Sequence, residues 1–494
     1  MENMKINKVK ALRFFFVVLL LSTVSVSCKK DFLETFPETS LSDATAFATP
    51  DRILGQVNGL YGGLKSGQHL GGRFLIYQDI RGEDFIVNKP NGVTGLDTWR
   101  HNLNSATNEV VNLWNTAYST INQANVFLKG IDGSGTVVTT TLADQYRSEA
   151  KFVRAFCYFN LLQLYAKPYT MGNGSNPGLP LRIQAETTSA NNDLARSTVA
   201  QVYTQILKDL DEAEAGLPAT YASAALNSSR AHKNTAIALK TRVYLAMGNY
   251  PKVIEESNKI ISATAPFKSA SGVTLQLESN IATVYGGTYI GSEAVFFLPM
   301  TDLSNPGTQN QLAHYYTAQS VGGFEEFYLN PAGIFANPVY ATGSTDARKS
   351  FIIANGTKNF VSKFKKPSPY TDYVPVIRYA EVLLNAAEAH TRGGNLVRGL
   401  ALLSEVRKRS DANYVFPLAN VGTQPDLINT ILTERRIELI CEGFRSFDLL
   451  RLGATIPAKS DATNVAQAVA PTSPAYIWPI SAQELANNKL MTPN

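Results

Sequence analysis

The stretch from Val376 to Gly453 constrains this chain most, because nearly all of it follows the helical period. In its first part, apolar residues recur at three-and-four spacing and form one stripe, while polar residues gather on another face. The stripe contains Ile377, Val382, Leu383, Ala386, Ala387 and Ala389, and the polar face contains Glu381, Asn385 and Glu388. Gly393 and Gly394 then end the helix, and the period resumes from Leu396 to Arg409. The pattern predicts an antiparallel helix pair.

A third helix is predicted from Asp426 to Leu452, and one side of it is strongly charged. Its acidic and basic residues are Glu434, Arg435, Arg436, Glu438, Glu442, Arg445, Asp448 and Arg451. Opposite charges three or four positions apart pair on a helix, and each exposed pair contributes about 0.2–0.5 kcal/mol. Catalytic carboxylates would give the same pattern, but an acid whose pKa stays near neutral needs isolation, and every acid here has an arginine within reach. We therefore favour structural ion pairs over catalysis.

A second helix pair is expected earlier in the chain, over 234–247 and 250–261. Its turn, Met247-Gly248-Asn249-Tyr250, is similar to the turn Arg392-Gly393-Gly394-Asn395-Leu396. Repeated helix-turn-helix units are typical of tetratricopeptide-like scaffolds. Further helices are expected over 49–64, 105–131, 141–165, 198–217 and, briefly, after a capping box at Ser481 and Glu484. The sequence thus predicts a mostly α fold, with tetratricopeptide-like helix pairs near 141–261 and 376–453.

Two regions lack this periodicity and are rich in glycine, proline or asparagine, namely 67–104 and 264–375. The second region holds eleven aromatic residues between 285 and 345, which are Tyr285, Tyr289, Phe296, Phe297, Tyr315, Tyr316, Phe324, Phe327, Tyr328, Phe335 and Tyr340. Aromatic side chains on loops beside a rigid scaffold indicate a ligand face, and a small irregular core is the alternative. In the first region, Trp99 stands in a polar loop, where no predicted apolar helix face accounts for a tryptophan.

Residues 1–27 have the pattern of an export signal. They begin with basic residues and continue with an apolar run from Phe14 to Leu21, which is too short to span a bilayer. Cys28 follows, where a bacterial lipoprotein carries its acylated cysteine, although Ser25 stands where a leucine is usual. The leader also holds +3 of the formal net charge of +5, so we infer no nucleic-acid partner. We expect a lipid anchor at Cys28 and one mature domain over 28–494.

The remaining residue patterns suggest no cofactor and no metal site. The sequence has no HExxH or GxSxG motif, and its five histidines are scattered. Cys157 and Cys441 each lie in an apolar helical run, which favours buried free thiols over a disulfide between them. We expect a protein that is not an enzyme, with a glycoside hydrolase as the less favoured alternative because it needs only two carboxylates across a cleft.

Several motifs, taken in their order, resemble the SusD/RagB family of outer-membrane lipoproteins of the Bacteroidota. They are CKKDFLETFP, WNTAYSTINQAN, SEAKFVRAFCYFNLLQLY, RVYLAMGNY, the triplet Asp346-Ala347-Arg348, RYAEVLLNAAEA, ERRIELICEGFRSFDLLRLG and YIWPI. The resemblance implies a tetratricopeptide-like scaffold with a loop-rich ligand face. It also implies a surface-exposed lid on a SusC-like TonB-dependent transporter, which captures an oligosaccharide or, in some members, a peptide for import.

The resemblance transfers few binding residues, because members of the family bind different ligands through different loops. Trp99 stands where the starch-binding relative carries a stacking tryptophan, so it is the first candidate. A sugar site needs exposed aromatic rings beside planar polar groups. From composition and position, the further candidates are Arg81, Asp84, Tyr289, Tyr315, Tyr316 and Tyr328.

Overall fold

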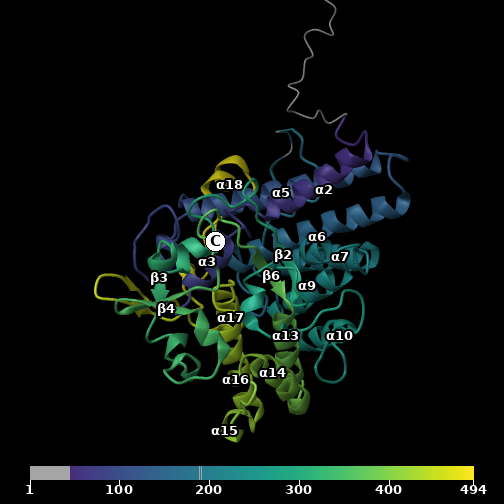
Figure 1. The fold of residues 1–494 in the computed structure, drawn as a ribbon. Coiled ribbons are helices and arrows are strands. Elements are labelled where there is room, and N and C mark those ends of the chain that lie inside the picture. The colour runs from purple at the N-terminus through teal and green to yellow at the C-terminus, as the bar shows by residue number, and fades with distance from the viewer. Residues whose placement is uncertain (1–44, 189, 191) are drawn as a thin grey trace, which may run out of the picture.

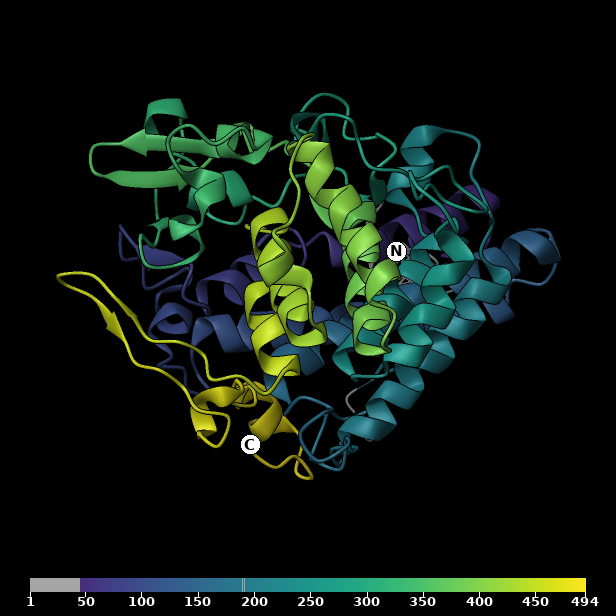
Figure 2. The same cartoon turned by 90° about the horizontal axis from the view of Figure 1, so that it is seen from below.

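In the described part of the chain, nine helices pack one against the next. Figures 1 and 2 show that they form a curved row, which is the frame of the molecule. The computed structural model describes residues 45–188, 190 and 192–494. Each helix in the row contacts the next: α2 Pro50–Leu64, α5 Asn108–Asp132, α6 Thr140–Tyr165, α7 Val199–Gly216, α9 Lys233–Ala246, α10 Tyr250–Ile260, α13 Tyr379–Arg392, α14 Leu396–Ser410 and α16 Gln424–Glu438. The predicted helix pairs and the mostly α fold are confirmed.

The two similar turns predicted from sequence have the same geometry. In each, a glycine takes the left-handed conformation, with φ of +70° at Gly248 and +87° at Gly394. An asparagine then caps the next helix: the side chain of Asn249 accepts a hydrogen bond from the backbone of Lys252, and that of Asn395 from Arg398. The shared turn therefore reflects a shared helix junction.

The prediction of one helix from Asp426 to Leu452 is wrong. Helix α16 ends at Glu438, and α17 Arg445–Arg451 begins after a break in which Cys441 and Gly443 have positive φ values of 67° and 81°. A Cβ on Gly443 would lie 2.8 Å from the Cα of Leu75, so the chain turns there to pack closely against another segment. Likewise, Ile377 belongs to strand β6 Val374–Arg378 and not to the helix that follows.

The remaining elements are short and lie mainly in the loop-rich regions. The described residues form four two-stranded antiparallel sheets, which pair β1 Phe85–Val87 with β3 Phe327–Leu329, β2 Ala294–Leu298 with β6, β4 Ile352–Asn355 with β5 Lys358–Val361, and β7 Lys459–Ser460 with β8 Val465–Ala466. The short helices are α3 Arg73–Ile80, α4 Leu96–Arg100, α8 Ala224–Ser229, α11 Ile281–Val284, α12 Leu312–Tyr316, α15 Leu418–Val421 and α18 Ala482–Asn487. The 3-10 helices are η3 Gln319–Val321, η4 Ile334–Ala336, η5 Pro338–Tyr340, η6 Ala347–Phe351 and η7 Pro474–Tyr476.

The charged residues of α13, α16 and α17 form a buried ion network instead of an exposed surface. Arg378 contacts Glu438 at 3.0 Å and Glu442 at 2.7 Å, and it also pairs with Glu293. Burial alone would raise the pKa of Glu438, but the guanidinium groups around it, Arg409, Arg378 and Arg348, hold that pKa well below its usual value. The predicted structural pairing is confirmed, although most pairs join different elements.

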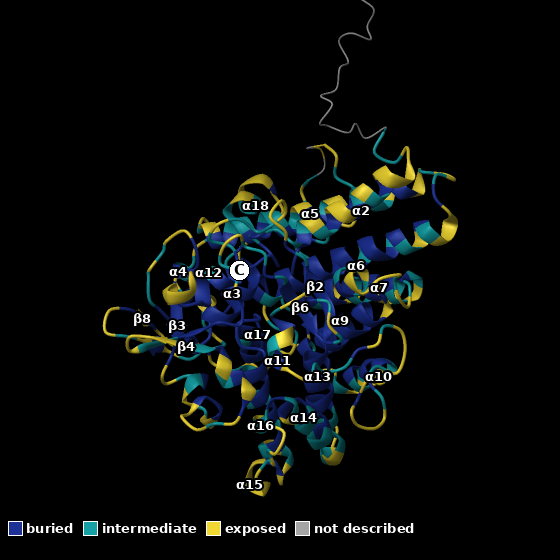
Figure 3. Ribbon diagram, viewed as in Figure 1, coloured by how far each residue is buried: buried dark blue, intermediate teal, exposed yellow. Residues whose placement is uncertain are grey.

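Most of the described interior is one large apolar core, which runs through both the helix row and the loop-rich regions, and a smaller cluster lies between α17 and the segment 456–477. Buried residues line the inner faces of the helices, and exposed residues concentrate at loops and outer faces (Figure 3). Cys157 and Cys441 are free and buried, as predicted. Among the residues that the structure describes, no helix combines the length and apolar character needed to cross a membrane. Residues 1–27 and Cys28 lie outside the described residues.

Candidate functional site

The region 67–104 is folded more tightly than its sequence predicts. Trp99 lies on helix α4 and is 0% exposed, so the expectation that its ring is available at the surface is wrong. Its Nε1 donates a hydrogen bond of 2.8 Å to the carbonyl oxygen of Phe85, and the ammonium group of Lys459 lies 5.2 Å from the ring centre. A ring enclosed in this way supports the core and offers no face to a sugar.

Arg81 and Asp84 are also buried, and both have protein partners. Arg81 donates hydrogen bonds to the carbonyl oxygens of Ala475, at 3.0 Å, and Tyr476, at 2.6 Å. Burial lowers the pKa of Arg81 to about 10. Asp84 pairs with Arg436 and accepts a hydrogen bond of 2.8 Å from the backbone of Ile334. These two polar side chains therefore join distant segments and do not project to the surface.

The cover over this region comes from the far end of the sequence. The segment 456–476 contains the β7–β8 hairpin, which Figure 2 shows extending along one edge of the molecule. His101 bridges the two regions, since one ring nitrogen lies 2.9 Å from the carbonyl oxygen of Arg81 and the other 2.9 Å from that of Gln467. Local sequence could not indicate this cover, because nearly 370 residues separate the partners.

The three further tyrosines of the predicted face belong to the irregular core. Tyr315 and Tyr316 on α12 are fully enclosed, and the Tyr315 hydroxyl donates to the carbonyl oxygen of Gln309 at 2.6 Å. Tyr328 on β3 is buried under the ammonium group of Lys358, which lies 4.7 Å from its ring centre. The alternative of a small irregular core is therefore correct for these rings.

An exposed aromatic group does exist in the region 264–375, and it centres on Phe324. This ring is 39% exposed and stacks on His314, with ring centres 4.7 Å apart and planes 5° apart. Lys89 lies 5.1 Å from the ring centre and pairs with Glu325 at 3.6 Å. Glu325 has a φ of 61°, and its carboxylate accepts hydrogen bonds from Gln319 and Asn355. Phe324 is thus held at the surface by a well-bonded, strained neighbour.

A second aromatic group includes the predicted candidate Tyr289. Its ring stacks on the partly exposed Tyr373, with centres 4.8 Å apart and planes 12° apart. Its hydroxyl donates to Asp372 at 2.7 Å, and Lys366 lies 5.0 Å from its ring centre. Burial, and next the carboxylate of Asp372, raise the pKa of Tyr289 well above its usual value. Tyr289 therefore supports Tyr373, which is the more accessible ring.

The segment that carries Lys366 and Pro367 joins the two aromatic groups. A Cβ on Gly322, two residues before Phe324, would lie 3.1 Å from Pro367. We call the set Tyr289, His314, Phe324, Lys366, Tyr370 and Tyr373 the loop face. Tyr289, Glu325 and Tyr370 all have positive φ, and such backbone strain persists where the surroundings impose it, often at ligand sites. The loop face offers aromatic rings, hydroxyl groups and a lysine in a fixed arrangement.

Sequence reasoning missed Tyr373 and Lys366 and did not select Phe324. A usable signal was present, because Lys365-Lys366-Pro367-Ser368-Pro369-Tyr370 is rich in proline and has no helical period. It marks an irregular segment outside the scaffold.

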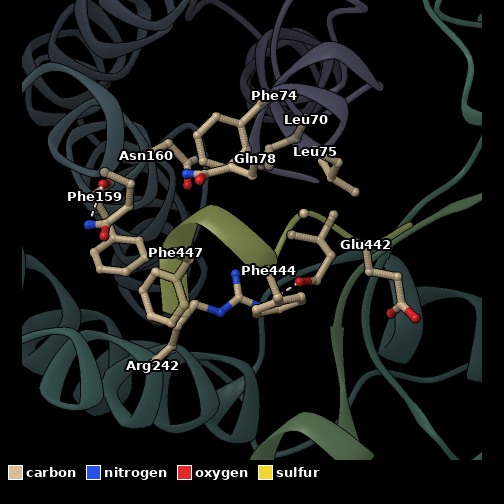
Figure 4. A pocket seen from close by; sticks show the side chains of 13 residues that line it. Leu70, Phe74, Leu75, Gln78, Phe159, Asn160, Arg242, Glu442, Phe444 and Phe447 are labelled. Atoms are coloured by element: carbon tan, nitrogen blue, oxygen red, sulfur yellow. Dashed lines mark hydrogen bonds between the residues drawn. The ribbon is translucent and has the colours of Figure 1, made fainter. Parts of the chain in front are cut away.

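An internal pocket between α3, α6 and the segment 442–447 is too small for a sugar. Figure 4 shows its lining, in which Phe74, Phe159, Phe444 and Phe447 face Asn160, Gln78 and Arg242. Its volume of about 20 Å³ accommodates one water molecule at most. In the part of the chain that the structure describes, no cluster of three or more histidine, cysteine, aspartate or glutamate residues could hold a metal ion.

Comparison with known proteins gives consistent results over the whole chain. Residues 31–245 match a family described as "Starch-binding associating with outer membrane", and residues 338–494 match the SusD family. SusD-like protein P38 of Formosa agariphila is 25% identical, over 99% of each chain. The crystal structure of a SusD superfamily protein from Bacteroides fragilis is 32% identical with a TM-score of 0.80, covering 90% of this chain and 99% of that one. A laminarin-binding SusD-like protein shares the fold, with a TM-score of 0.69 and 19% identity over 90% of this chain and 99% of that one.

Proposed function

The chain belongs to the SusD family, and from this premise we propose that it is a surface-exposed outer-membrane lipoprotein that binds an oligosaccharide and delivers it to a SusC-like TonB-dependent transporter. The observation that carries the proposal is the 32% identity to a SusD superfamily structure over 90% of the chain. The description of the matching family, which names starch binding and the outer membrane, supports a glycan ligand.

We place the oligosaccharide on the loop face. A sugar ring has an apolar face and a rim of hydroxyl groups, so it binds where an exposed aromatic ring lies beside polar side chains. Phe324 and Tyr373 provide such rings, while Lys89, Gln319 and Asn355 provide polar groups beside Phe324. Among the residues first predicted, Tyr289 takes part through Tyr373, whereas Trp99, Arg81, Asp84, Tyr315, Tyr316 and Tyr328 support the surface from below.

We also propose that the protein acts without catalysis. A glycosidase needs two carboxylates about 5–10 Å apart that are free to exchange protons with a substrate. In the helical stretch that raised this alternative, Glu434, Glu438, Glu442 and Asp448 all pair with arginine or lysine and are buried. The neighbouring cations hold the pKa of Glu438, Glu442 and Asp448 below its usual value, so these three acids have no proton to give at neutral pH.

The direct test is calorimetric titration of the chain lacking residues 1–28, which leaves every residue of the described core in place. The ligands are neutral oligosaccharides of several linkages, together with a peptide library. We expect saturable binding of at least one oligosaccharide, with no hydrolysis products after prolonged incubation. Binding of peptides alone would replace the glycan ligand with a peptide, and turnover would establish the hydrolase.

Variants of the loop face locate the site. Phe324→Ala and Tyr373→Ala each remove an accessible ring, so each should weaken binding about tenfold, which corresponds to about 1.4 kcal/mol. Leu303→Ala is the matched control, because Leu303 is fully exposed in the same region but belongs to neither aromatic group. If all three variants bind the oligosaccharide with equal affinity, the loop face is not the binding site, although the protein still binds a glycan.

The anchor and the partner need separate tests in cells. Cys28→Ser prevents acylation, so the full chain should leave the outer-membrane fraction and become soluble. When the acylated chain is purified from its own outer membrane, a TonB-dependent transporter should purify with it in a one-to-one ratio. A Cys28→Ser chain that stays in the membrane fraction would contradict the lipid anchor.

A further inference from the structure

An open cleft of about 450 Å³ lies at the end of the helix row formed by α14 and α16. Its walls are the loop 411–417 after α14, one side of α16, and the turn 337–345, which contains η5. Figure 1 shows α14, α15 and α16 at the lower end of the molecule, opposite α2 and α18. Sites for small organic ligands have volumes of about 300–1,000 Å³. The cleft is therefore large enough for a short oligosaccharide, and none of its lining residues belongs to the loop face.

One wall of the cleft is aromatic. Tyr414 and Phe416 pack edge to face, with ring centres 5.0 Å apart and planes 83° apart, and both rings are partly exposed. The guanidinium group of Arg407 lies 4.0 Å from the centre of Tyr414. This contact holds the tyrosine ring in place, and the backbone of Tyr414 also donates to the carbonyl oxygen of Asp411 at 3.0 Å. Two oriented rings thus face a space of ligand size.

The floor of the cleft contains a buried donor that lacks a hydrogen bond. Arg407 is only 6% exposed, and its Nη1 donates to Glu434 at 3.2 Å. Its Nε has no hydrogen-bond partner within the described part of the chain, and the nearest carboxylate oxygen, on Asp346, is 3.5 Å away. A buried N–H without a hydrogen bond is costly even on a guanidinium whose charge is paired, so a ligand oxygen that reaches this Nε would be stabilised there.

The rim of the cleft carries polar groups that suit sugar hydroxyls. The side-chain amides of Asn420 and Asn429 form no hydrogen bond with other residues that the structure describes. Thr430 and Thr433 donate to backbone carbonyl oxygens, at 2.6 Å and 2.9 Å, which leaves their oxygens able to accept. Eleven of the fifteen lining residues have a polar side chain, so the cleft suits a ligand with many hydroxyls better than an apolar one.

The charges of the cleft favour a neutral ligand. Among the described residues that line the cleft, Arg407 is the only cationic one. It already pairs with Glu434, and Asp411 adds a negative charge nearby. An acidic sugar would meet those carboxylates without a free cation to compensate. We propose that this cleft is a second carbohydrate site, which binds a neutral oligosaccharide independently of the loop face. The inference rests on the proposed function, because both sites would act on the same class of ligand.

Calorimetric titration of the chain lacking residues 1–28 tests the cleft directly. The neutral probes are laminarihexaose, maltohexaose, cellohexaose and mannohexaose, and tetragalacturonate is the acidic comparison. We expect Tyr414→Ala and Phe416→Ala to weaken one binding event with a neutral probe by tenfold or more. Val415→Ala is the matched control, since Val415 is 77% exposed between the two rings but does not line the cleft, and its affinity should stay within twofold. Circular dichroism and thermal unfolding confirm that each variant is folded.

The possible outcomes separate this inference from the proposed function. If the wild-type chain binds a neutral probe and both cleft variants bind it equally well, the second site is overturned and the proposed function stands. If Phe324→Ala removes one binding event and Tyr414→Ala another, two independent sites are established. If only tetragalacturonate binds through the cleft, the neutral class is wrong. If the wild-type chain binds none of the five probes, the cleft and the oligosaccharide ligand both fail.

Discussion

The helical stretch 376–453 and the segment 67–109 both bury titratable side chains, yet they stabilise them in opposite ways. In the helical stretch, opposite charges meet: burial would raise the pKa of Glu442 and of Asp448, but arginine and lysine neighbours hold both values below normal. At two carboxylates of the segment 67–109, Asp79 and Glu109, burial dominates instead. It raises the pKa of each carboxylate to about 7.

The difference follows from the partners that each region finds. Asp79 accepts hydrogen bonds from the backbone of Gly443, Phe444 and Arg445, and Glu109 accepts them from Asp97 and Thr98. Neither carboxylate forms an ion pair with any residue that the structure describes. Backbone donors satisfy a carboxylate without neutralising it. Charge on the helical stretch therefore fixes the scaffold, whereas in the segment 67–109 buried polar groups tie the surface loops to the core.

The largest expected effect is that of Arg378→Met. This change leaves Glu438, Glu442 and Glu293 without their shared cation in a buried site, and breaking a buried pair from one side costs about 3–5 kcal/mol. We expect the upper end of that range, about 5 kcal/mol, in chemical unfolding. Arg147→Gln is the control, since Arg147 pairs with Asp132 and Asp144 at the surface and should contribute less than about 1 kcal/mol. Similar losses in the two variants would refute a special role for the buried network.

The next effect tests the segment 67–109 through Trp99→Ala. Removing a fully enclosed tryptophan should lower the free energy of unfolding by about 4 kcal/mol, because it leaves a cavity. Glycan affinity should stay unchanged, since the ring lies below the surface. Phe324→Ala should do the reverse, with weaker binding and a stability change within about 0.5 kcal/mol. A folded Trp99→Ala variant with tenfold weaker binding would return Trp99 to the binding site.

The features that could be predicted from the sequence are those that residues close in the chain determine. Helix bounds such as those of α6 and α10, the paired turns at Asn249 and Asn395, and the pairing of acids with arginines all depend on residues close in the chain. The sequence did not predict which loop residues are exposed, because exposure depends on distant cover. Trp99 is enclosed by Lys459, and Arg81 by the carbonyl oxygens of 475 and 476. Residue type alone does not distinguish these buried side chains from the exposed ring of Phe324.

The free energy of unfolding should also depend on pH, because buried histidines and buried carboxylates shift it in opposite directions. Burial lowers the pKa of His69 to about 3, and that of His101 and of His232 to about 4. Below about pH 6.5 the unfolded chain protonates these three histidines but the folded chain does not. They therefore lower the free energy of unfolding of the protein as pH falls from about 6.5 to 4. Asp79 and Glu109 act in the other direction: the folded chain takes their protons near pH 7, before the unfolded chain does at about pH 4. Stability should therefore fall moderately between pH 7 and 4, and steeply below pH 4, where the ion network is protonated.

The smallest expected effect isolates one of these contributions. Glu109→Gln removes a carboxyl group whose protonation stabilises the folded protein as pH falls. Between pH 7 and 4.5, the free energy of unfolding should therefore fall more in the variant than in the wild type, by about 1–3 kcal/mol. Glu255→Gln, at an exposed residue that pairs with Lys252, should leave the pH profile unchanged. A Glu109→Gln profile parallel to that of the wild type would mean that Glu109 is ionised in the folded chain. The segment 67–109 would then hold a charged carboxylate in its interior, as the helical stretch does. The two regions would differ only in the partners of that charge, which are backbone donors in one and arginine or lysine side chains in the other.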